Sequence, residues 1–211
     1  MRLDGYTVGQ IDIYMKVALM SHKGGVGKTS TAIHVAACLQ KSSPALLVDG
    51  DSNRSALGWA ERANGLPFKV VSEKQSPKYW RDFEHCIIDT GARPDKADLR
   101  DLIELTDMII VVMACDALSL HTLAPTIEAL QAVQSNNYRI LLSMVPPIGY
   151  AGIEARETIT AAKLPIFKAE IRKYAAVAKS ALFGCLVCDV RDEHAMDAWA
   201  DYVSISKELM R

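Results

Sequence analysis

A glycine-rich turn near the N-terminus constrains the fold of this chain more than any other feature. Its residues are Lys23, Gly24, Gly25, Val26, Gly27, Lys28, Thr29 and Ser30. An apolar run over residues 17–20 precedes the turn, and a helical pattern over residues 29–40 follows it. A strand that leads through such a turn into a helix presents consecutive backbone N–H groups and a positive helix terminus to an anion. We therefore expect a polyphosphate site, in which Lys28 reaches the β- and γ-phosphates, Thr29 binds Mg²⁺ and Ser30 donates to the α-phosphate.

Short apolar segments alternate with longer helical patterns along the rest of the chain. We expect strands over residues 17–20, 45–48, 68–71, 86–88, 108–113, 140–145 and 166–169. Helices are expected over residues 29–40, 55–63, 96–105, 120–135, 152–162, 174–183 and 194–210. Several strand segments are apolar without alternation, which is typical of strands covered on both faces. The pattern predicts one α/β domain over residues 15–211, a mostly parallel twisted sheet with helices on both faces, preceded by an extension of residues 1–14.

Composition excludes several classes of protein. The net charge of −1 over 211 residues rules out a polycation, so any contact with nucleic acid needs a local basic patch. The longest apolar run, residues 108–115, is too short for a membrane span, and residues 1–14 lack the apolar stretch of a signal peptide. Five cysteines are an odd number, and the pair Cys185 and Cys188 has no second ligand pair for zinc. We expect a cytoplasmic protein with reduced thiols.

Carboxylates follow two of the predicted strands. Asp49 and Asp51 lie just beyond residues 45–48, and Asp89 ends the apolar run of residues 86–88. Ligands on a parallel sheet bind beyond the carboxyl ends of its strands, so these side chains should lie beside the predicted phosphate site. Asp89 can hold the hydration shell of Mg²⁺, which keeps several waters in nucleotide sites. Asp49 either holds its loop or binds a water on the metal; a polar strand end or a helix N-cap is the alternative for both Asp49 and Asp51.

The turn resembles the deviant Walker A motif of the ParA/MinD family of P-loop ATPases, although His22 stands where the strict P-loop pattern has its first glycine. Residues 86–91 are similar to Walker B followed by switch II, and the resemblance covers nearly the whole chain from Met15 onward. The family's usual D-x-D-P-Q is replaced here by DGDSN at residues 49–53. The resemblance implies a P-loop NTPase fold of the deviant Walker A class, closest to the small ParA-type partition ATPases.

The same resemblance implies a function and a set of roles. Lys23 would reach across an ATP-sandwich homodimer to the partner's nucleotide, and Asp51 would orient the attacking water. Met144 and Pro146 stand where relatives contact adenine, although a simple strand end fits them equally well. The expected activity is slow Mg²⁺-dependent ATP hydrolysis, stimulated by a ParB-like or cargo adaptor protein, in plasmid or chromosome partition or in cargo positioning on the nucleoid. The final helix lacks a Lys/Arg-rich face, so no membrane partner is expected.

Two other functions fit the same motifs. One is a metabolic P-loop enzyme of the dethiobiotin synthetase-like class, which has no use for Lys23. The other is a nucleotide-dependent binding module with little hydrolysis, which the altered segment at residues 49–53 favours.

One local excess of positive charge lies between residues 163 and 179. Its basic residues, against the single acid Glu170, are Lys163, Lys168, Arg172, Lys173 and Lys179. Clustered Lys and Arg are what sequence-independent binding to DNA phosphates requires. The segment is therefore a candidate contact for nucleoid DNA, with a solvated helix face as the alternative.

Overall fold

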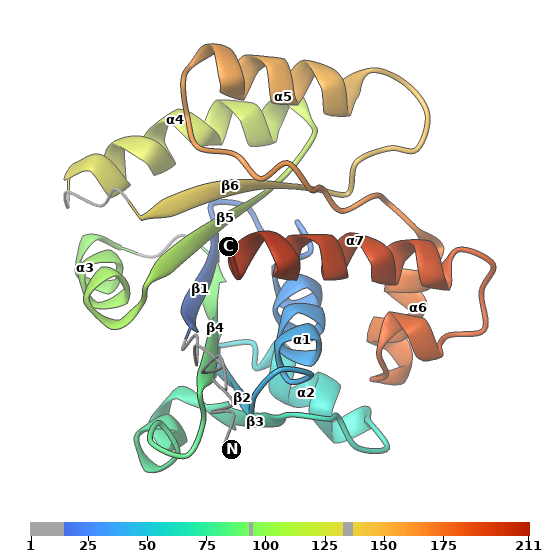
Figure 1. The fold of residues 1–211 in the computed structure, drawn as a ribbon. Coiled ribbons are helices and arrows are strands. Elements are labelled where there is room, and N and C mark those ends of the chain that lie inside the picture. Colours follow the sequence, from blue (N-terminus) through green and yellow to red (C-terminus); the bar gives the residue numbers. More distant parts are fainter. Residues whose placement is uncertain (1–14, 93–94, 133–136) are drawn as a thin grey trace, which may run out of the picture.

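A single six-stranded parallel sheet forms the centre of the molecule. The computed structural model describes residues 15–92, 95–132 and 137–211, so the expected extension of residues 1–14 lies outside the described part (Figure 1). The strands lie side by side in the order β3-β2-β4-β1-β5-β6, and every pair is parallel. Their bounds are β1 Met15–Ser21, β2 Ala45–Gly50, β3 Lys69–Ser72, β4 His85–Ala92, β5 Met108–Ala114 and β6 Tyr138–Ser143. The predicted fold class is confirmed.

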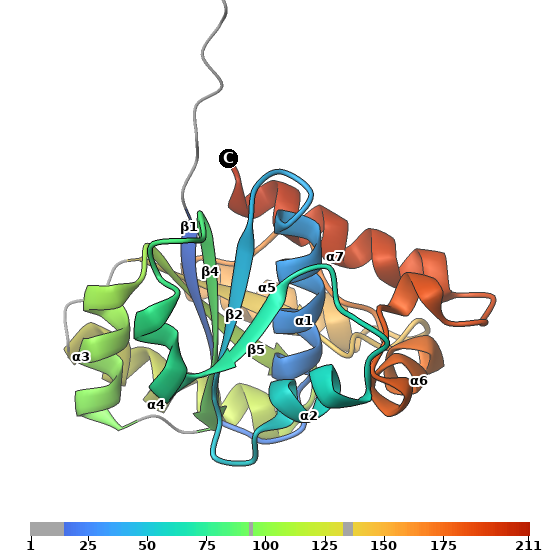
Figure 2. The ribbon, with the colours of Figure 1, turned by 90° about the horizontal axis from the view of Figure 1, so that it is seen from below.

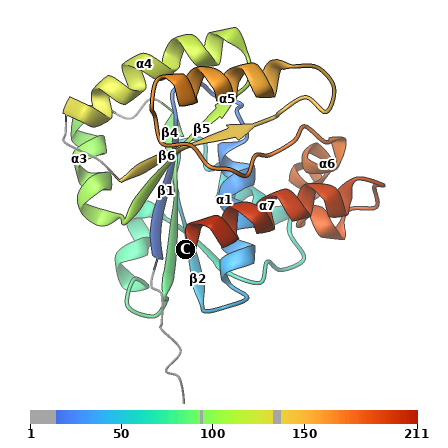
Figure 3. The ribbon, with the colours of Figure 1, turned by 45° about the horizontal axis from the view of Figure 1, so that its top comes forward.

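Helices cover both faces of this sheet. On one face pack α1 (Lys28–Leu39), α2 (Ser55–Arg62), α6 (Ala175–Phe183), the short 3₁₀ turn η2 (Val187–Asp189) and α7 (Ala195–Leu209). On the other pack the 3₁₀ helix η1 (Glu73–Lys78), α3 (Lys96–Leu105), α4 (Ala117–Ala132) and α5 (Ala151–Ala161). Figures 2 and 3 show α1 and α7 together on one side, with α3 and α4 on the other. Within the described residues, no helix has the length and apolar character needed to cross a membrane.

The central strands are apolar at successive positions because both of their faces are covered. In β1, Val17 and Leu19 enter the core under α1 and α7, whereas Ala18 and Met20 enter the core under α3, α4 and α5. All four side chains are almost fully buried. Side chains alternate between the two faces of a strand, so a continuous apolar run supplies both cores at once.

The prediction of a strand over residues 166–169 is wrong. This part of the chain forms no regular strand, and it pairs with the sheet side through two isolated parallel bridges, Ile140 with Ile166 and Val145 with Arg172. Between the two bridges, the segment from Ile166 to Arg172 has one residue more than the facing stretch from Ile140 to Val145. The extra residue makes the backbone bulge and interrupts regular strand pairing. The carboxylate of Glu208, at the end of α7, accepts the backbone N–H groups of residues 168 and 169 at 3.0 and 3.1 Å. An acid 40 residues away in the sequence thus replaces the missing strand bonds.

A buried histidine joins α1 to the C-terminal part of the chain. The His34 side chain lies within 2.6 Å of the Ser30 carbonyl through Nδ1 and accepts the Val187 N–H through Nε2 at 2.9 Å, which defines the neutral ring protonated on Nδ1. It also stacks on Tyr202 with ring centroids 4.3 Å apart. Burial lowers the pKa of His34 to about 4.

This histidine predicts a loss of stability in mild acid. Because its folded pKa lies below the ordinary value of about 6.5, the unfolded chain binds a proton that the folded chain rejects as pH falls from about 6.5 towards 4. We expect the free energy of unfolding to drop by about 2 kcal/mol between pH 7.5 and pH 5 through this group. Urea unfolding at several pH values measures the slope, and His34→Gln should flatten it while lowering stability at pH 7.5. An unchanged slope in that variant would contradict the assignment.

Candidate nucleotide-binding site

The glycine-rich turn joins β1 to α1 at the carboxyl edge of the sheet. Gly25 and Gly27 have φ angles of 77° and 84°, in the left-handed region that favours glycine, and Gly27 is the N-cap of α1. The Ser143 hydroxyl, at the end of β6, donates to the Val26 carbonyl at 2.6 Å, and the Ser21 hydroxyl donates to the Lys23 carbonyl at 3.1 Å. Two serine hydroxyls, one from the end of β6 and one from the end of β1, therefore fix the conformation of the turn, which leads into the N-terminus of α1.

The ion pair between Lys28 and Asp89 lies buried beneath this turn. The Lys28 amino group contacts Asp89 Oδ1 at 2.9 Å and also donates to the backbone carbonyl of Thr90. The two side chains are 8% and 0% exposed. Burial raises the pKa of Asp89, and the neighbouring charge of Lys28 opposes that rise. Lysine and carboxylate are thus held together where the Walker A and Walker B segments meet.

A divalent cation fits the free side of Asp89. Asp89 Oδ2 is buried and has no hydrogen-bond partner among the described residues, which is costly unless a ligand completes it. The Thr29 hydroxyl lies close enough to lower the pKa of Asp89. In the described part of the chain, no group of three or more His, Cys, Asp or Glu side chains can hold a metal. A hard cation held by one carboxylate, one hydroxyl and the oxygens of a bound phosphate is the arrangement that Mg²⁺ prefers.

The two aspartates after β2 have different surroundings. The buried Asp49 carboxylate accepts the N–H groups of Asp51 at 3.1 Å and Leu57 at 2.8 Å, so it holds the loop and the start of α2. Asp51 is half-buried, and its carboxylate accepts the Asn53 N–H at 2.9 Å. Asp51 is the one of the two that lines the cleft beside the glycine-rich turn. The structure thus gives Asp49 the loop-holding role and leaves the Asp51 carboxylate facing the site.

A cleft of about 650 Å³ contains most of the predicted phosphate-binding residues. It also includes residues that were not predicted as nucleotide ligands: Ser21, Asn53, Arg54, Ser55, Gly58, Trp59, Arg62, Ala92 and Ala181. Arg54 has a φ of 53°, a left-handed conformation that is uncommon outside glycine. In the sequence, the one feature that could have predicted Arg54 as a cleft residue is its position directly after Asn53, in the loop that carries Asp51.

A smaller pocket of about 170 Å³ adjoins the cleft and shares lining residues with it. Met144 lines both cavities, together with Gly27 and Ser30 of the turn, and Tyr174 and Val177 line the smaller one. This pocket is mostly apolar. The two candidate adenine contacts separate here, because Pro146 lines a different groove beside α5.

Comparison with known proteins agrees with this geometry. The family described as "CobQ/CobB/MinD/ParA nucleotide binding domain" matches residues 17–187. The chain belongs to this family. The ParA/MinD resemblance seen in the sequence is confirmed.

Individual ParA/MinD relatives resemble the chain over most of its length. It is 32% identical over 203 residues to "Maintenance of carboxysome distribution protein A" of Gloeobacter kilaueensis, covering 92% of this chain and 94% of that protein. It is 29% identical over 163 residues to "Sporulation initiation inhibitor protein Soj" of Bacillus subtilis, covering 71% of this chain and 57% of Soj. Among solved structures, the ATP complex of a Cyanothece McdA variant matches with a TM-score of 0.74 at 14% identity, covering 94% of this chain and 96% of that one.

The Lys23 side chain of this ParA/MinD-family chain is held by an acid. Its amino group lies 3.2 Å from Asp116 Oδ2 and 3.3 Å from Oδ1, just beyond β5, and both side chains are partly exposed. Lys23 therefore lies at the rim of the site, outside the cleft that contains Lys28.

The five basic residues of the predicted DNA patch divide into two groups. The Arg172 guanidinium binds the Asp201 carboxylate through two nitrogens, at 2.7 and 3.1 Å, and Lys179 pairs with Asp192 at 2.6 Å. Within the chain their charges are already compensated. Lys163, Lys168 and Lys173 are exposed and have no ion-pair partner among the residues that the structure describes.

Proposed function

We propose that this chain is a Mg²⁺-dependent ATPase that switches between a monomer and an ATP-sandwich homodimer. The observation that carries the proposal is the buried contact between Lys28 and Asp89 beneath the glycine-rich turn, with one Asp89 oxygen left without a partner in the described part of the chain. A triphosphate in the adjoining cleft would take Lys28 as its counter-charge. The near full-length similarity to a carboxysome distribution protein favours a positioning ATPase over a metabolic enzyme.

The residues of the chain divide the work of hydrolysis. The N–H groups of the turn, Lys28 and Thr29 bind and orient the triphosphate, and phosphoryl transfer depends mainly on such positioning and on charge stabilisation. When bound, Mg²⁺ neutralises charge on the phosphate oxygens. Asp51 orients the attacking water. Lys23 leaves Asp116 and acts on the nucleotide of the second subunit.

Sedimentation combined with an ATPase assay tests this proposal. The wild-type chain should sediment as a dimer with AMPPNP and Mg²⁺, and as a monomer with ADP or with EDTA. Hydrolysis should be slow and should rise when DNA and a cargo adaptor are added together. Turnover that depends on a small metabolite, with a monomer throughout, would instead establish the metabolic enzyme.

We further propose that the dimer binds nucleoid DNA in the cytoplasm without sequence preference, through Lys163, Lys168 and Lys173. The exposed position of these lysines supports this set over Arg172 and Lys179, whose charges are paired. Dimerisation doubles the number of lysines facing one duplex, so DNA binding should depend on ATP.

Replacing two of these lysines should weaken DNA binding for every sequence alike. For Lys163→Gln combined with Lys168→Gln, we expect the slope of log affinity against log salt to fall by about 4 for the dimer, because each lysine releases roughly one counterion and the dimer carries two copies of each. Fluorescence anisotropy with two duplexes of unrelated sequence, at several salt concentrations, measures this slope. Lys179→Gln is the matched control and should have little effect, because Asp192 already neutralises that charge. If Lys179→Gln weakened DNA binding more than the double variant does, the proposed assignment of the DNA site to Lys163 and Lys168 would be wrong.

A further inference from the structure

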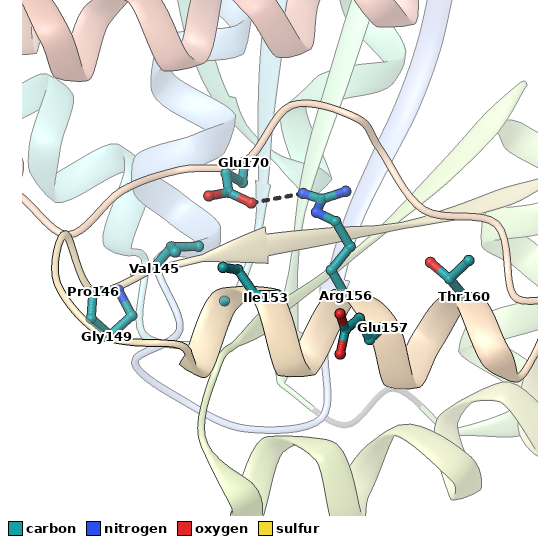
Figure 4. Close-up of a pocket in the computed structure, with 9 residues that line it drawn as sticks. Val145, Pro146, Gly149, Ile153, Arg156, Glu157, Thr160 and Glu170 are labelled. Carbon is teal, nitrogen blue, oxygen red and sulfur yellow. Dashed lines mark hydrogen bonds and ion pairs between the residues drawn. The ribbon is translucent and has the colours of Figure 1, made fainter.

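A groove runs beside α5, on the flank of the sheet and separate from the nucleotide cleft. It has a volume of about 570 Å³ and lies between α5 and the bulged segment that follows residue 166 (Figure 4). Val145, Pro146 and Ile153 give it an apolar surface, and Arg156, Glu157 and Glu170 give it charge. None of these residues belongs to the nucleotide cleft. The proposed hydrolysis therefore makes no use of this groove.

Large exposed apolar side chains lie in and next to the stretch of chain that lines the groove. Ile148 and Tyr150, on either side of the lining residue Gly149, are 88% and 73% exposed, and Ile153 on α5 is 55% exposed. Single exposed apolar residues are ordinary, but a cluster at the rim of a groove marks a surface that binds protein.

The groove is preformed. Gly149 has a φ of 102°, which favours glycine. A Cβ on Gly152 would lie 2.6 Å from Val145 Cγ1, so α5 can lie this close to Val145 only with a glycine there. Across the groove, Arg156 donates to Glu170 at 2.8 Å (Figure 4). Arg156 also donates to the Phe167 carbonyl at 2.7 Å. A site with fixed walls spends less conformational entropy when it binds.

The charge of the groove selects its occupant. Arg156 is already paired with Glu170, whereas Glu154 and Glu157 are exposed on α5 and have no ion-pair partner in the described part of the chain. Among the residues that line the groove, the one charge left without an ion-pair partner in the described part of the chain is therefore the negative charge of Glu157. A segment that buries apolar side chains against Ile153 and brings a lysine or arginine to Glu157 is complementary to this surface.

The groove is also connected to the nucleotide site by four consecutive residues. Ser143 holds the glycine-rich turn through Val26, and Met144, with a left-handed φ of 51°, lines the nucleotide cleft. The next two residues, Val145 and Pro146, line the groove. A ligand that shifts this short segment acts on both sites, and such coupling is reciprocal.

We propose that the groove beside α5 is the docking site for a segment of a partner protein that carries apolar side chains and at least one lysine or arginine. The partner's role as the adaptor that stimulates hydrolysis rests on the proposed function, whereas binding of the segment does not.

Selection of displayed peptides tests the proposal on the whole chain. Random dodecapeptides on phage are selected against the wild-type chain with AMPPNP and Mg²⁺, after depletion on Ile153→Ser. Enriched peptides should combine apolar residues with lysine or arginine. A synthetic peptide of the enriched sequence should lose about tenfold in affinity on Glu157→Lys and on Ile153→Ser, the scale of a single interface anchor.

Matched variants elsewhere separate the groove from general surface effects. Glu128→Lys, exposed on α4, repeats the change of charge, and Leu182→Ser, exposed on α6, repeats the loss of an apolar side chain. Both should bind the peptide within about twofold of wild type. Selection of acidic peptides, or of none that distinguish Ile153→Ser from wild type, would overturn the proposal. So would a loss of AMPPNP-dependent dimers in the groove variants without a change in peptide binding, because it would assign the groove to a second copy of the chain.

The same samples separate this inference from the proposed function. Peptide binding by a wild-type chain that fails to bind ATP would refute the ATPase and leave the docking site standing. Normal ATP hydrolysis, with no selected peptide whose binding depends on the groove, would refute the docking site and leave the ATPase standing.

Discussion

Lys28→Ala should abolish ATP binding, with an affinity at least about 100-fold weaker than that of wild type, since the variant loses a charge-assisted bond in a buried site. In the structure the Lys28 amino group is held by Asp89 and the Thr90 carbonyl, both directly below the turn. The variant should be less stable than wild type, because it leaves the buried Asp89 carboxylate without its lysine. Titration calorimetry with AMPPNP and Mg²⁺ measures the effect.

Thermal unfolding and a matched lysine complete this experiment. Lys74→Ala removes an exposed lysine from η1 and should bind AMPPNP like wild type. Lys28→Ala should keep a cooperative unfolding transition. Retention of wild-type affinity in folded Lys28→Ala would place the nucleotide outside this cleft and refute the proposed function.

Asp51→Ala should slow ATP hydrolysis by about 100-fold or more, the usual contribution of a group that positions or deprotonates a nucleophile. Nucleotide binding should persist, because the turn is held by Ser143 and Ser21 and the loop by Asp49, and none of these bonds uses the Asp51 side chain. With ATP and Mg²⁺ the variant should therefore accumulate as a dimer. Phosphate release and sedimentation on the same sample measure the two effects.

Asp51→Asn distinguishes the chemistry of Asp51 from its part in the loop. The Asp51 carboxylate accepts the Asn53 N–H, and an asparagine oxygen can accept the same bond. If the carboxylate orients the water, the asparagine variant should be as slow as the alanine variant. Recovery of wild-type hydrolysis in Asp51→Asn would show that Asp51 supports only the turn.

Local patterns in the sequence were sufficient for the fold and for the centre of the nucleotide site. Continuous apolar runs require strands covered on both faces, and each predicted strand except residues 166–169 appears in the sheet within a few residues of its expected bounds. The turn from Lys23 to Ser30 carries its own backbone requirements in Gly25 and Gly27, so its conformation follows from the residues themselves. The position of Asp89 was equally predictable. It ends a buried strand, and in a parallel sheet the end of that strand lies at the same edge as the turn that follows β1.

Interactions between distant parts of the chain were beyond those patterns. Nothing near residue 168 indicates that Glu208 will take its backbone N–H, and that long-range bond decides between a bulge and a strand. Arg172 and Lys179 look like available positive charges in the sequence, but Asp201 and Asp192, from the following helix and its approach, compensate both. Pro146 follows Met144 by two residues, yet the chain turns between them and sends the two side chains to different cavities.

The sequence by itself determined the parallel α/β sheet, the glycine-rich turn and the acids at the strand ends, because each depends on residues within one turn or strand. Tertiary structure alone decided which charges remain free, which side chains share a cavity and where the groove beside α5 lies. Those properties depend on side chains from separate elements meeting at short range, and a Coulomb or hydrogen-bond contact of about 3 Å leaves no periodic trace in the sequence.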